Sequence, residues 1–407
     1  MSSLSMPLSA PSGGRGSALI VALGVTQVVG YGCLYYAFAV LAPGITASLG
    51  WAPEWTYGGF AIGLLIGGLV APLAGRLIDQ YGTRVVMTIG SALAGLSLLA
   101  LAEARGPVSY IGAMIALEVV SALVLYDAAF TALTQAHGPG ARRAISQLTL
   151  IGGFASTLFW PLTTALLNTF DWREIYRIYA VLQFALCIPL HWLLLPGPVR
   201  SGPKDAKATD SSAPAAAGYL EGEARRNAFV LLALAFSLQG FVVSAMSVHM
   251  LTMLQGLGLS AAVAVGIGAM VGPSQVAGRL AEMLFGTSLD PVTTAWTSAA
   301  LMPIGFALLM VGGVTATLAG LFAISYGISM GLSSIVRGTV PLKLFGPAGY
   351  GAMLGKLSAP GLIVKAAAPL LFAVLIERAG LMTSTMLLVV LSALAAIALF
   401  LLARKVR

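Results

Sequence analysis

Long apolar stretches alternate with short polar segments along almost the whole chain. Twelve of these stretches have about the ~20 residues that a helix needs to cross the hydrocarbon core of a bilayer. The pattern therefore predicts an all-α membrane protein with two groups of six transmembrane helices. The predicted helices are 17–45, 55–78, 84–103, 109–135, 144–168, 174–195, 227–254, 261–286, 293–312, 316–340, 350–376 and 381–403.

A polar segment at 196–226 separates the two groups of predicted helices. It is rich in Ser, Pro, Ala, Lys and Asp and lacks apolar periodicity, which is typical of a flexible linker. We therefore predict a six-helix bundle at 1–195, a linker at 196–226 and a second bundle at 227–407. The apolar run at 17–45 is longer than the roughly 7 to 15 residues of a signal-peptide core, so we interpret it as a retained span.

Three dipeptides recur at one fixed offset between the two halves. Leu49-Gly50 returns as Leu257-Gly258, Gly138-Pro139 as Gly346-Pro347, and Pro161-Leu162 as Pro369-Leu370, each 208 residues later. The common offset indicates an internal duplication and hence two pseudo-symmetric six-helix bundles. Two such halves joined by a polar linker are the layout of carriers that bind their substrate between the halves, near the membrane midplane.

The basic residues predict which side of the membrane the termini occupy. With the N-terminus inside, 14 basic residues fall on that side and 4 on the other, an excess typical of the cytoplasmic face. We therefore expect a multi-pass protein of the cell inner (plasma) membrane with both termini cytoplasmic. The net charge of +8 does not indicate nucleic-acid binding, because the basic residues lie mainly in short segments between apolar runs.

The sequence predicts no metal site, cofactor or disulfide framework. Cys33 and Cys187 both fall within apolar runs, and His191 and His249 have no Cys or acidic neighbours at ligand spacing. We interpret both histidines as packed or interfacial residues. The chain also lacks a G-x-x-x-x-G-K-[ST] phosphate loop, which argues against direct coupling to ATP.

A ten-residue segment after the second predicted helix carries a family signature. Residues 75–84 read Gly-Arg-Leu-Ile-Asp-Gln-Tyr-Gly-Thr-Arg. This segment resembles the G-x-L-x-D-x-x-G-x-R loop motif of the major facilitator superfamily, and the resemblance implies membrane transport. Gly75 and Gly82 suit close packing and a tight turn, and Asp79 is placed to face helix N-termini. We expect these residues, with Arg84, to act as a conformational latch.

Four cations fall within predicted helices: Arg279, Arg337, Lys356 and Lys365. Of these, Arg279 and Lys365 are the candidates for a binding site. A charge at membrane depth is costly and usually faces a partner or a water-filled cavity. Gly278-Arg279-Leu280 is similar to a segment of the oxalate:formate antiporter and monocarboxylate transporter branch, where an arginine of span eight and a lysine of span eleven bind carboxylate. By that resemblance, Arg279 holds a carboxylate bidentately and Lys365 adds a point charge. Glu282 departs from the pattern of that branch.

Two alternatives to a substrate role for Arg279 stay open. Gly278-Arg279-Leu280 also repeats Gly75-Arg76-Leu77, although its spacing from the preceding Leu-Gly pair predicts that Arg279 lies five residues, or ~7 Å, deeper. Alternatively, Arg279 pairs with Glu282, one turn away on the same helix face. For Lys365, no carboxylate is nearby in the sequence.

Three further polar residues are expected to orient the anion. Tyr31 and Tyr35 are four positions apart and share a helix face, and Gln275 precedes Arg279 by one turn. An aromatic belt at the membrane surface is the alternative for the tyrosines.

Three carboxyl groups are candidates for carrying a coupling proton: Glu118, Asp127 and Glu282. Glu118 and Asp127 are nine residues apart, so a continuous helix places them on opposite faces. For Asp127, which is closer to the cytoplasmic end, an ion pair with a basic loop residue is the structural alternative.

Together these features predict a secondary active transporter, not an enzyme. Its substrate is a small organic anion, a monocarboxylate or dicarboxylate, moved by alternating access. Its other partners are the lipid bilayer and either protons or a counter-anion. The alternative is a proton-driven exporter of apolar or drug-like compounds that uses Glu118 or Asp127 as its proton site.

Overall fold

The computed structural model describes residues 13–197, 219–286, 289–310 and 314–406. In these residues, twelve helical segments are long and apolar enough to cross a membrane, and none of their ends differs by more than five residues from its predicted position. The predicted all-α membrane fold is therefore confirmed. Most of the predicted linker, at 196–226, lies outside the described residues.

The first six spans are built from ten α-helices and three short helical turns. They are α1 (Gly13–Tyr31), η1 (Gly32–Tyr36), α2 (Ala37–Leu49), α3 (Pro53–Tyr81), α4 (Thr83–Ala102), α5 (Pro107–Val124), α6 (Tyr126–His137), η2 (Gly138–Ala141), α7 (Arg142–Gly152), α8 (Ala155–Leu166), α9 (Trp172–Leu182), η3 (Gln183–Cys187) and α10 (Ile188–Leu194).

Each of the last six spans is a single helix. They are α11 (Gly222–Gly256), α12 (Ala261–Phe285), α13 (Pro291–Met310), α14 (Ala316–Phe345), α15 (Tyr350–Ala379) and α16 (Leu381–Val406).

The helix α11 begins at Gly222, five residues before the predicted start at 227. The first turn of α11 is polar, so a prediction based on apolar runs does not include it. The chain is tied there to the end of α14, because the Leu220 amide donates to the Leu344 carbonyl (2.9 Å) and Arg225 donates to the Phe345 carbonyl (3.4 Å). These bonds satisfy carbonyls that the last turn of α14 leaves without helical partners.

Four spans of the first half are interrupted. Short π-helical turns, η1 and η3, divide the first and sixth spans, and such turns are frequent at functional sites. Leu125 is extended (φ −83°, ψ −163°) and separates α5 from α6. Gln27 of α1 donates to the Val124 carbonyl (2.8 Å) at this break. The fifth span breaks at Gly153, between α7 and α8.

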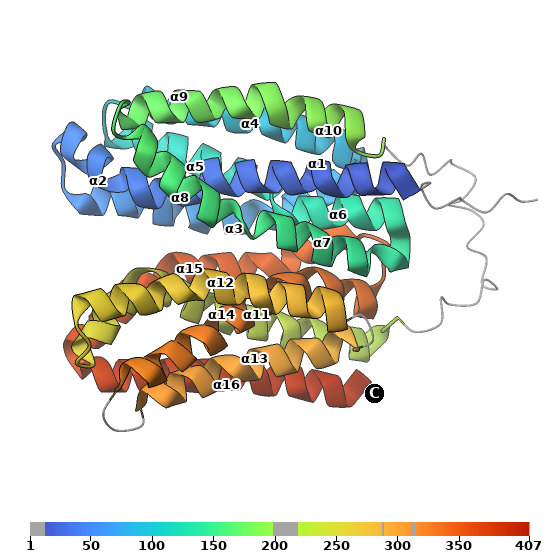
Figure 1. Ribbon diagram of the computed structural model, residues 1–407. Coiled ribbons are helices and arrows are strands. Elements are labelled where there is room, and N and C mark those ends of the chain that lie inside the picture. The colour runs from blue at the N-terminus through green and yellow to red at the C-terminus, as the bar shows by residue number, and fades with distance from the viewer. Residues whose placement is uncertain (1–12, 198–218, 287–288, 311–313, 407) are drawn as a thin grey trace, which may run out of the picture.

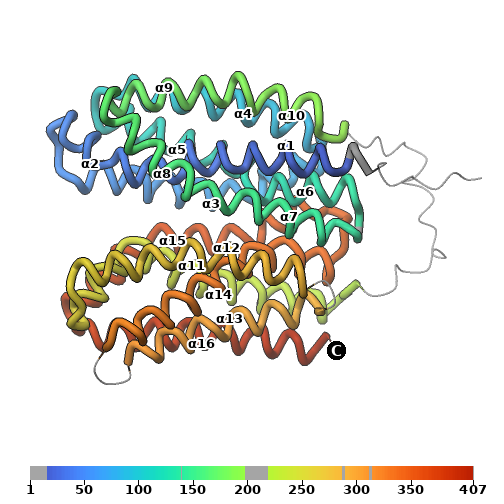
Figure 2. Tube along the Cα trace, viewed as in Figure 1, coloured from blue at the N-terminus to red at the C-terminus, as the bar shows by residue number. Residues whose placement is uncertain are grey.

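The helices form two groups that correspond to the two halves of the sequence (Figure 1). We call "linker side" the end of the molecule where α1 begins, α10 ends, α11 begins and α16 ends. The same grouping is clear in the Cα trace, with α1 to α10 in one group and α11 to α16 in the other (Figure 2).

The two halves are joined most closely on the linker side. The helix α3 lies along α15 so tightly that a Cβ at Gly75 would be 2.1 Å from the Gly351 carbonyl oxygen. On the other flank, α7 packs against α12 and α14. Leu342 and Leu354 of the second half also belong to a hydrophobic core shared with first-half helices. The structure is therefore closed on the linker side.

The repeated dipeptides occupy equivalent positions in the two halves. Leu49-Gly50 and Leu257-Gly258 end the first and seventh spans, and Pro161 and Pro369 lie inside the fifth and eleventh. The fifth and eleventh spans begin at Arg142 and Tyr350, again 208 residues apart. The offset in the sequence thus corresponds to a structural repeat.

Candidate functional site

Arg279 projects from α12 toward the first half. The residue is only 6% exposed, and its Nε donates to the Gly331 carbonyl (3.3 Å) and the Ser334 hydroxyl (3.2 Å) on α14. These bonds orient the guanidinium. Its Nη1 and Nη2 atoms form no hydrogen bond with the described residues, so the outer edge of the fork remains available to a ligand.

The break between α7 and α8 receives this guanidinium. A Cβ at Gly153 would lie 1.8 Å from Nη1 of Arg279, and a Cβ at Gly152 would lie 2.6 Å from the Tyr126 hydroxyl. Only glycine leaves room for such approaches. The site therefore brings a cation of the second half against main chain of the first.

Glu282 is not the partner of Arg279 in this structure. Its Oε1 accepts from Arg142 Nη2 (3.2 Å), and its Oε2 accepts from the Ser146 hydroxyl (2.8 Å). The same Arg142 guanidinium also donates to the Gly286 carbonyl (2.7 Å). Glu282 thus joins the end of α12 to the start of α7 across the interface.

Arg76 and Arg279 lie at similar distances from the ends of their helices, and the difference of ~7 Å in depth stays a prediction. Arg76 lies five residues before Tyr81, the last residue of α3, and Arg279 lies six residues before Phe285, the last of α12. The difference is in direction: Arg76 is exposed and Arg279 is buried. One residue rotates a helical position by about 100°. Spacing from the preceding Leu-Gly pair does not reveal this direction, and it differs between the two arginines because α3 has 29 residues and α12 has 25.

Lys365 lies on α15, facing α11. A Cβ at Gly240 would be 3.4 Å from its Cγ and Cε atoms. Pro369 has no N–H to donate to the Lys365 carbonyl, and the Ser244 hydroxyl donates to it instead (2.7 Å). The Lys365 ammonium makes no hydrogen bond or ion pair with the described residues, and Arg337 and Asp127 are within electrostatic range.

Tyrosines of the first half face these cations. Tyr31 packs against Tyr126, with ring centroids 4.7 Å apart, and Tyr35 packs against Tyr36 at 5.4 Å. Tyr36 and Tyr126, which were not among the predicted site residues, are the tyrosines in electrostatic range of Arg279. The π-turn η1 spreads the tyrosines of the first span over the interface.

Gln275 lies one turn before Arg279 on α12 and is half-buried. Its main chain packs closely on α14, because a Cβ at Gly331 would lie 2.3 Å from the Gln275 carbonyl oxygen. The predicted orienting residue is thus on the Arg279 face of α12.

Asp127 contacts the second half. Its Oδ1 lies 3.6 Å from Arg337 Nε, and its Oδ2 accepts from the Ser358 hydroxyl (2.5 Å). The partner is a cation within α14, where sequence analysis considered basic residues in loops. No sequence pattern pairs residues 127 and 337, because only the tertiary packing of the halves brings them together.

Glu118 lies apart from Asp127, in the core of the first half. The residue is 7% exposed, its Oε1 has no hydrogen-bond partner among the described residues, and it packs against Gly63 and Gly67 of α3. Because the span breaks at Leu125, the angle between Glu118 and Asp127 is not set by a continuous helix. The two carboxyl groups face different surroundings.

The family motif contacts the start of α15. The two oxygens of Asp79 accept from the main-chain amides of Gly351 (3.0 Å) and Ala352 (2.7 Å). These amides have no helical acceptors, and the positive end of the helix dipole favours the carboxylate. Gly82 has φ +83° at the turn into α4, and Arg84 donates to the Leu195 carbonyl (2.8 Å) at the end of α10.

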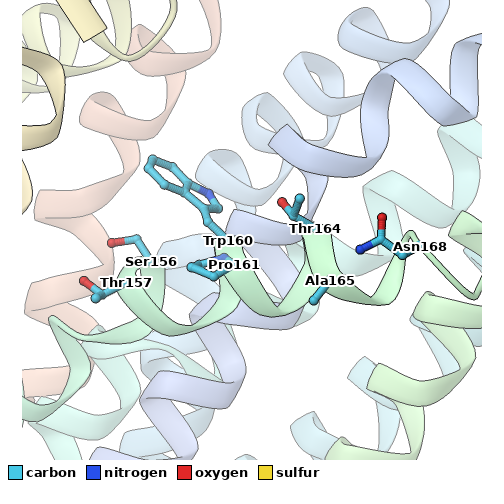
Figure 3. A pocket seen from close by; sticks show the side chains of 7 residues that line it. All are labelled: Ser156, Thr157, Trp160, Pro161, Thr164, Ala165 and Asn168. Atoms are coloured by element: carbon cyan, nitrogen blue, oxygen red, sulfur yellow. The ribbon is translucent and has the colours of Figure 1, made fainter. Parts of the chain in front are cut away.

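An open groove of about 580 Å³, which we call the α8 cavity, lies along one face of α8 (Figure 3). Ser156, Trp160 and Thr164 follow one another at four-residue intervals on this face, and Asn168 continues the series after the helix. Trp160 packs edge-on against the Tyr36 ring at 5.9 Å, and Tyr36 is in electrostatic range of Arg279. This polar face therefore runs from the tyrosine cluster beside Arg279 toward the side opposite the linker.

His191 and His249 have structural partners. His191 Nε2 lies 3.0 Å from the Thr26 hydroxyl, and His249 Nε2 lies 2.9 Å from the Pro369 carbonyl. No group of three or more His, Cys, Asp or Glu that could hold a metal ion occurs in the described part of the chain.

Sequence reasoning missed several residues of this site. Arg337 was noted as a cation within a span but was given no role, and Ser156, Trp160 and Tyr36 were not assigned to the site. The four-residue spacing of Ser156, Trp160 and Thr164 was a readable signal for one polar face within an apolar run. The contact between Arg337 and Asp127 had no such signal.

Comparisons with known proteins agree with this architecture. The family model described as Major Facilitator Superfamily matches residues 23–358. A search among curated proteins gave no match.

Two solved structures share the fold. One is the human organic anion transporter MFSD10 (TETRAN), with 17% sequence identity and a TM-score of 0.73 over 96% of this chain and 100% of that one. The other is the proton:xylose symporter XylE bound to 6-bromo-6-deoxy-D-glucose, with 14% identity and a TM-score of 0.72 over 94% and 95%. The family match covers most of the sequence, and this chain belongs to the Major Facilitator Superfamily.

Proposed function

We propose that this secondary transporter carries a small organic anion, a monocarboxylate or dicarboxylate, through the space between its two halves. The observation that supports the proposal most is the state of two cations. Neither the Nη atoms of Arg279 nor the ammonium of Lys365 has a carboxylate partner among the described residues. Charges in such surroundings are costly without a partner, and an anionic substrate offsets that cost.

The roles of the binding residues follow from their donors. Arg279 offers two parallel N–H groups to one carboxylate, and Lys365 offers a point charge. Tyr31, Tyr35 and Gln275 orient the anion, as the sequence predicted. Tyr36 and Tyr126 are added to this set because they flank Arg279.

We further propose that the uncharged part of the anion lies along the α8 cavity. Trp160 is 48% exposed there, although it is in contact with Tyr36. Hydroxyl groups and an indole suit a substrate body that has both polar and apolar surface.

Alternating access then requires the linker side to open. We place the protein in the cell inner membrane with both termini in the cytoplasm. In this orientation the linker side faces the cytoplasm, and the structure is closed toward it. Gly75, Asp79, Gly82 and Arg84 form the proposed latch, and the bonds from Asp79 to α15 are its contact between the halves. Rocking of one half against the other breaks these bonds.

Among the three candidates for a coupling proton, we favour Glu118. Asp127 and Glu282 are each engaged by an arginine and a serine across the interface. Glu118 has no ion pair among the described residues, and one of its oxygens is buried without a hydrogen bond. A counter-anion is the alternative partner for exchange.

A second candidate function is a proton-driven exporter of apolar compounds. The observation that favours it is the aromatic surface formed by Tyr35, Tyr36, Phe60 and Trp160, in the same half of the protein as Glu118. Such an exporter has no need for cationic side chains without carboxylate partners, such as Arg279 and Lys365, at the same interface. Competition by carboxylates therefore distinguishes the two functions.

The test is uptake into proteoliposomes of labelled oxalate, succinate, lactate and benzoate, with and without a pH gradient. Arg279→Gln and Lys365→Gln are expected to reduce uptake about tenfold or more, since each removes a charged hydrogen bond to the anion. Lys356→Gln is the matched control, because Lys356 is an exposed lysine on the same helix as Lys365. Equal transport of neutral compounds by all variants, with no uptake of acids, contradicts the anion site.

A further inference from the structure

Arg337 is a third cation at the interface and is held by both halves. It extends from α14, its Nη2 donates to the Ser358 hydroxyl (2.7 Å), and its Nε lies 3.6 Å from Asp127 Oδ1. Ser358 in turn donates to Asp127 Oδ2 (2.5 Å). Three residues from α6, α14 and α15 thus form one polar cluster.

This cluster is part of the same electrostatic environment as the proposed anion site. Both Arg337 and Asp127 are within electrostatic range of Lys365 and of Tyr31. Arg337 is near Lys365 and has a carboxylate partner, Asp127, in the other half of the protein. Ser358, which binds Arg337, and Lys365 are seven residues apart on α15, so the two cations lie along the same face of that helix.

The ion pair between Arg337 and Asp127 is longer and more exposed than a well-formed buried ion pair. At 3.6 Å it exceeds hydrogen-bond length and is not bidentate, and the two side chains are 30% and 23% exposed. The other ion pair across the halves, between Arg142 and Glu282, is shorter at 3.2 Å, with the glutamate side chain only 4% exposed. Of these two pairs, the one at Arg337 is easier for an incoming anion to replace.

We propose that Arg337 is a substrate-binding residue that Asp127 occupies while the site is empty. An incoming carboxylate takes the place of Asp127 on Arg337, and Ser358 keeps the guanidinium in position through Nη2. The exchange removes one link between α6 and α14 and so favours opening of the linker side. This inference rests on the proposed anion function and adds a residue and a switching step to it.

The main test is a double-mutant cycle measured as the half-saturating concentration of acid uptake. The probes are oxalate, succinate, lactate and benzoate in proteoliposomes containing the full-length protein. Arg337→Gln is expected to raise the half-saturating concentration about tenfold or more, because it removes a charged donor to the anion. Asp127→Asn is expected to lower it about threefold or more, since the competing carboxylate is gone.

In the double variant, Asp127→Asn is expected to have no further effect, because Asp127 acts through Arg337. Asp290→Asn is the control, since Asp290 pairs with Lys343 within the second half. An increased half-saturating concentration in Asp127→Asn, or an equal effect of that change with and without Arg337, overturns the proposal.

A second measurement reports opening directly. Ile145 is fully buried on α7, where it contacts the position of Gly338 on α14, so Ile145→Cys reacts slowly with a maleimide while the linker side is closed. Cys33 and Cys187 are buried and give little background. Asp127→Asn and Arg337→Gln are expected to speed labelling several-fold, and Asp290→Asn is not. Unchanged labelling in both variants also overturns the proposal.

The outcome separates this inference from the proposed function. If Arg279→Gln impairs acid uptake but Arg337→Gln does not, Arg337 is no substrate ligand, although the anion site stands. If the parent protein takes up none of the four acids, both fail. Arg337→Lys keeps the charge and is expected to lie between the parent and Arg337→Gln.

Discussion

Nη1 of Arg279 lies only 1.8 Å from the place where a Cβ of Gly153 would stand. The cation that the sequence places inside the eighth span is thus accommodated by the broken fifth span of the other half. A residue without a side chain at this break is a condition for the proposed anion site.

Gly153→Ala is therefore expected to displace the Arg279 guanidinium and to reduce acid uptake about 10- to 100-fold, because small shifts of a binding group are costly. Gly272→Ala on α12 is the control, since a Cβ there meets nothing within 4 Å. Thermal unfolding of both variants shows whether the effect is on the site or on the fold. Normal uptake by Gly153→Ala contradicts the described position of Arg279.

Ser244 is expected to stabilise α15 at its internal proline. Ser244→Ala leaves the Lys365 carbonyl without a partner and should cost about 1 kcal/mol of unfolding free energy. Pro369→Ala restores an N–H four residues after Lys365, so Ser244→Ala should be nearly neutral in that background. Denaturant unfolding in detergent measures the difference. An equal cost in both backgrounds contradicts this role of Ser244.

The proposed latch predicts that Asp79→Asn opens the linker side. The substitution removes the negative charge at the start of α15, an interaction of about 0.3–1 kcal/mol. Maleimide labelling of Ile145→Cys should become faster by a corresponding factor.

Glu103→Gln is the control for Asp79→Asn. Glu103 lies outside the spans, and its hydrogen bond with Arg177 lowers the pKa of the Glu103 carboxyl. The group is therefore charged at neutral pH, and the control also removes a carboxylate. Its ion pair joins two parts of the first half, so labelling should not change. Equal acceleration in the two variants argues against a specific latch.

Glu118→Gln is expected to abolish the dependence of uptake on a pH gradient. Exchange of labelled for unlabelled acid, which needs no net proton movement, should continue at more than about half the parent rate if the glutamine preserves the packing on Gly63 and Gly67. Parallel measurements of gradient-driven uptake and exchange provide the test. If gradient-driven uptake persists in Glu118→Gln, another residue carries the coupling proton.

Trp160→Ala is expected to weaken the uptake of benzoate more than that of oxalate. The benzoate ring can stack on Trp160, and losing that contact should cost about 1 kcal/mol, or roughly fivefold in half-saturating concentration. Oxalate has no ring and makes no such contact. Trp192→Ala is the control, because Trp192 is 55% exposed on α10, outside the cavity. An equal effect on both acids contradicts a role of the α8 face in binding the substrate body.

The span pattern and the duplication were predictable because both are periodic features of one chain. Apolar runs predicted twelve spans, and the repeated dipeptides predicted the equivalence of the turns around Gly50 and Gly258. The interruption at Leu125 was not predicted, because this residue does not stand out from a continuous apolar pattern. The Gly152-Gly153 pair is a signal for a break, but the apolar run around it was interpreted as one helix.

The site was predictable only in part. Arg279 and Lys365 stand out because charges are rare inside the spans. Their surroundings depend on residues of other helices, as the hydrogen bond of Arg279 with Ser334 and the close approach of Lys365 to Gly240 show. The sequence suggested Glu282 as a partner for Arg279 because the two share a helix face, and packing of the halves gives Glu282 to Arg142 instead.

The Asp79 carboxylate binds main-chain amides of α15 and no side chain of that helix. Its partners are amide groups that every amino acid except proline carries. Substitutions at positions 351 and 352 that respect the tight spacing thus leave the anchor chemically intact, whereas a change at position 79 removes it at once. The eleventh span is constrained by space at position 351 as well, because a Cβ there would lie 2.8 Å from Asp79 Oδ1. The contact therefore depends on a charge in the second span and on a missing side chain in the eleventh.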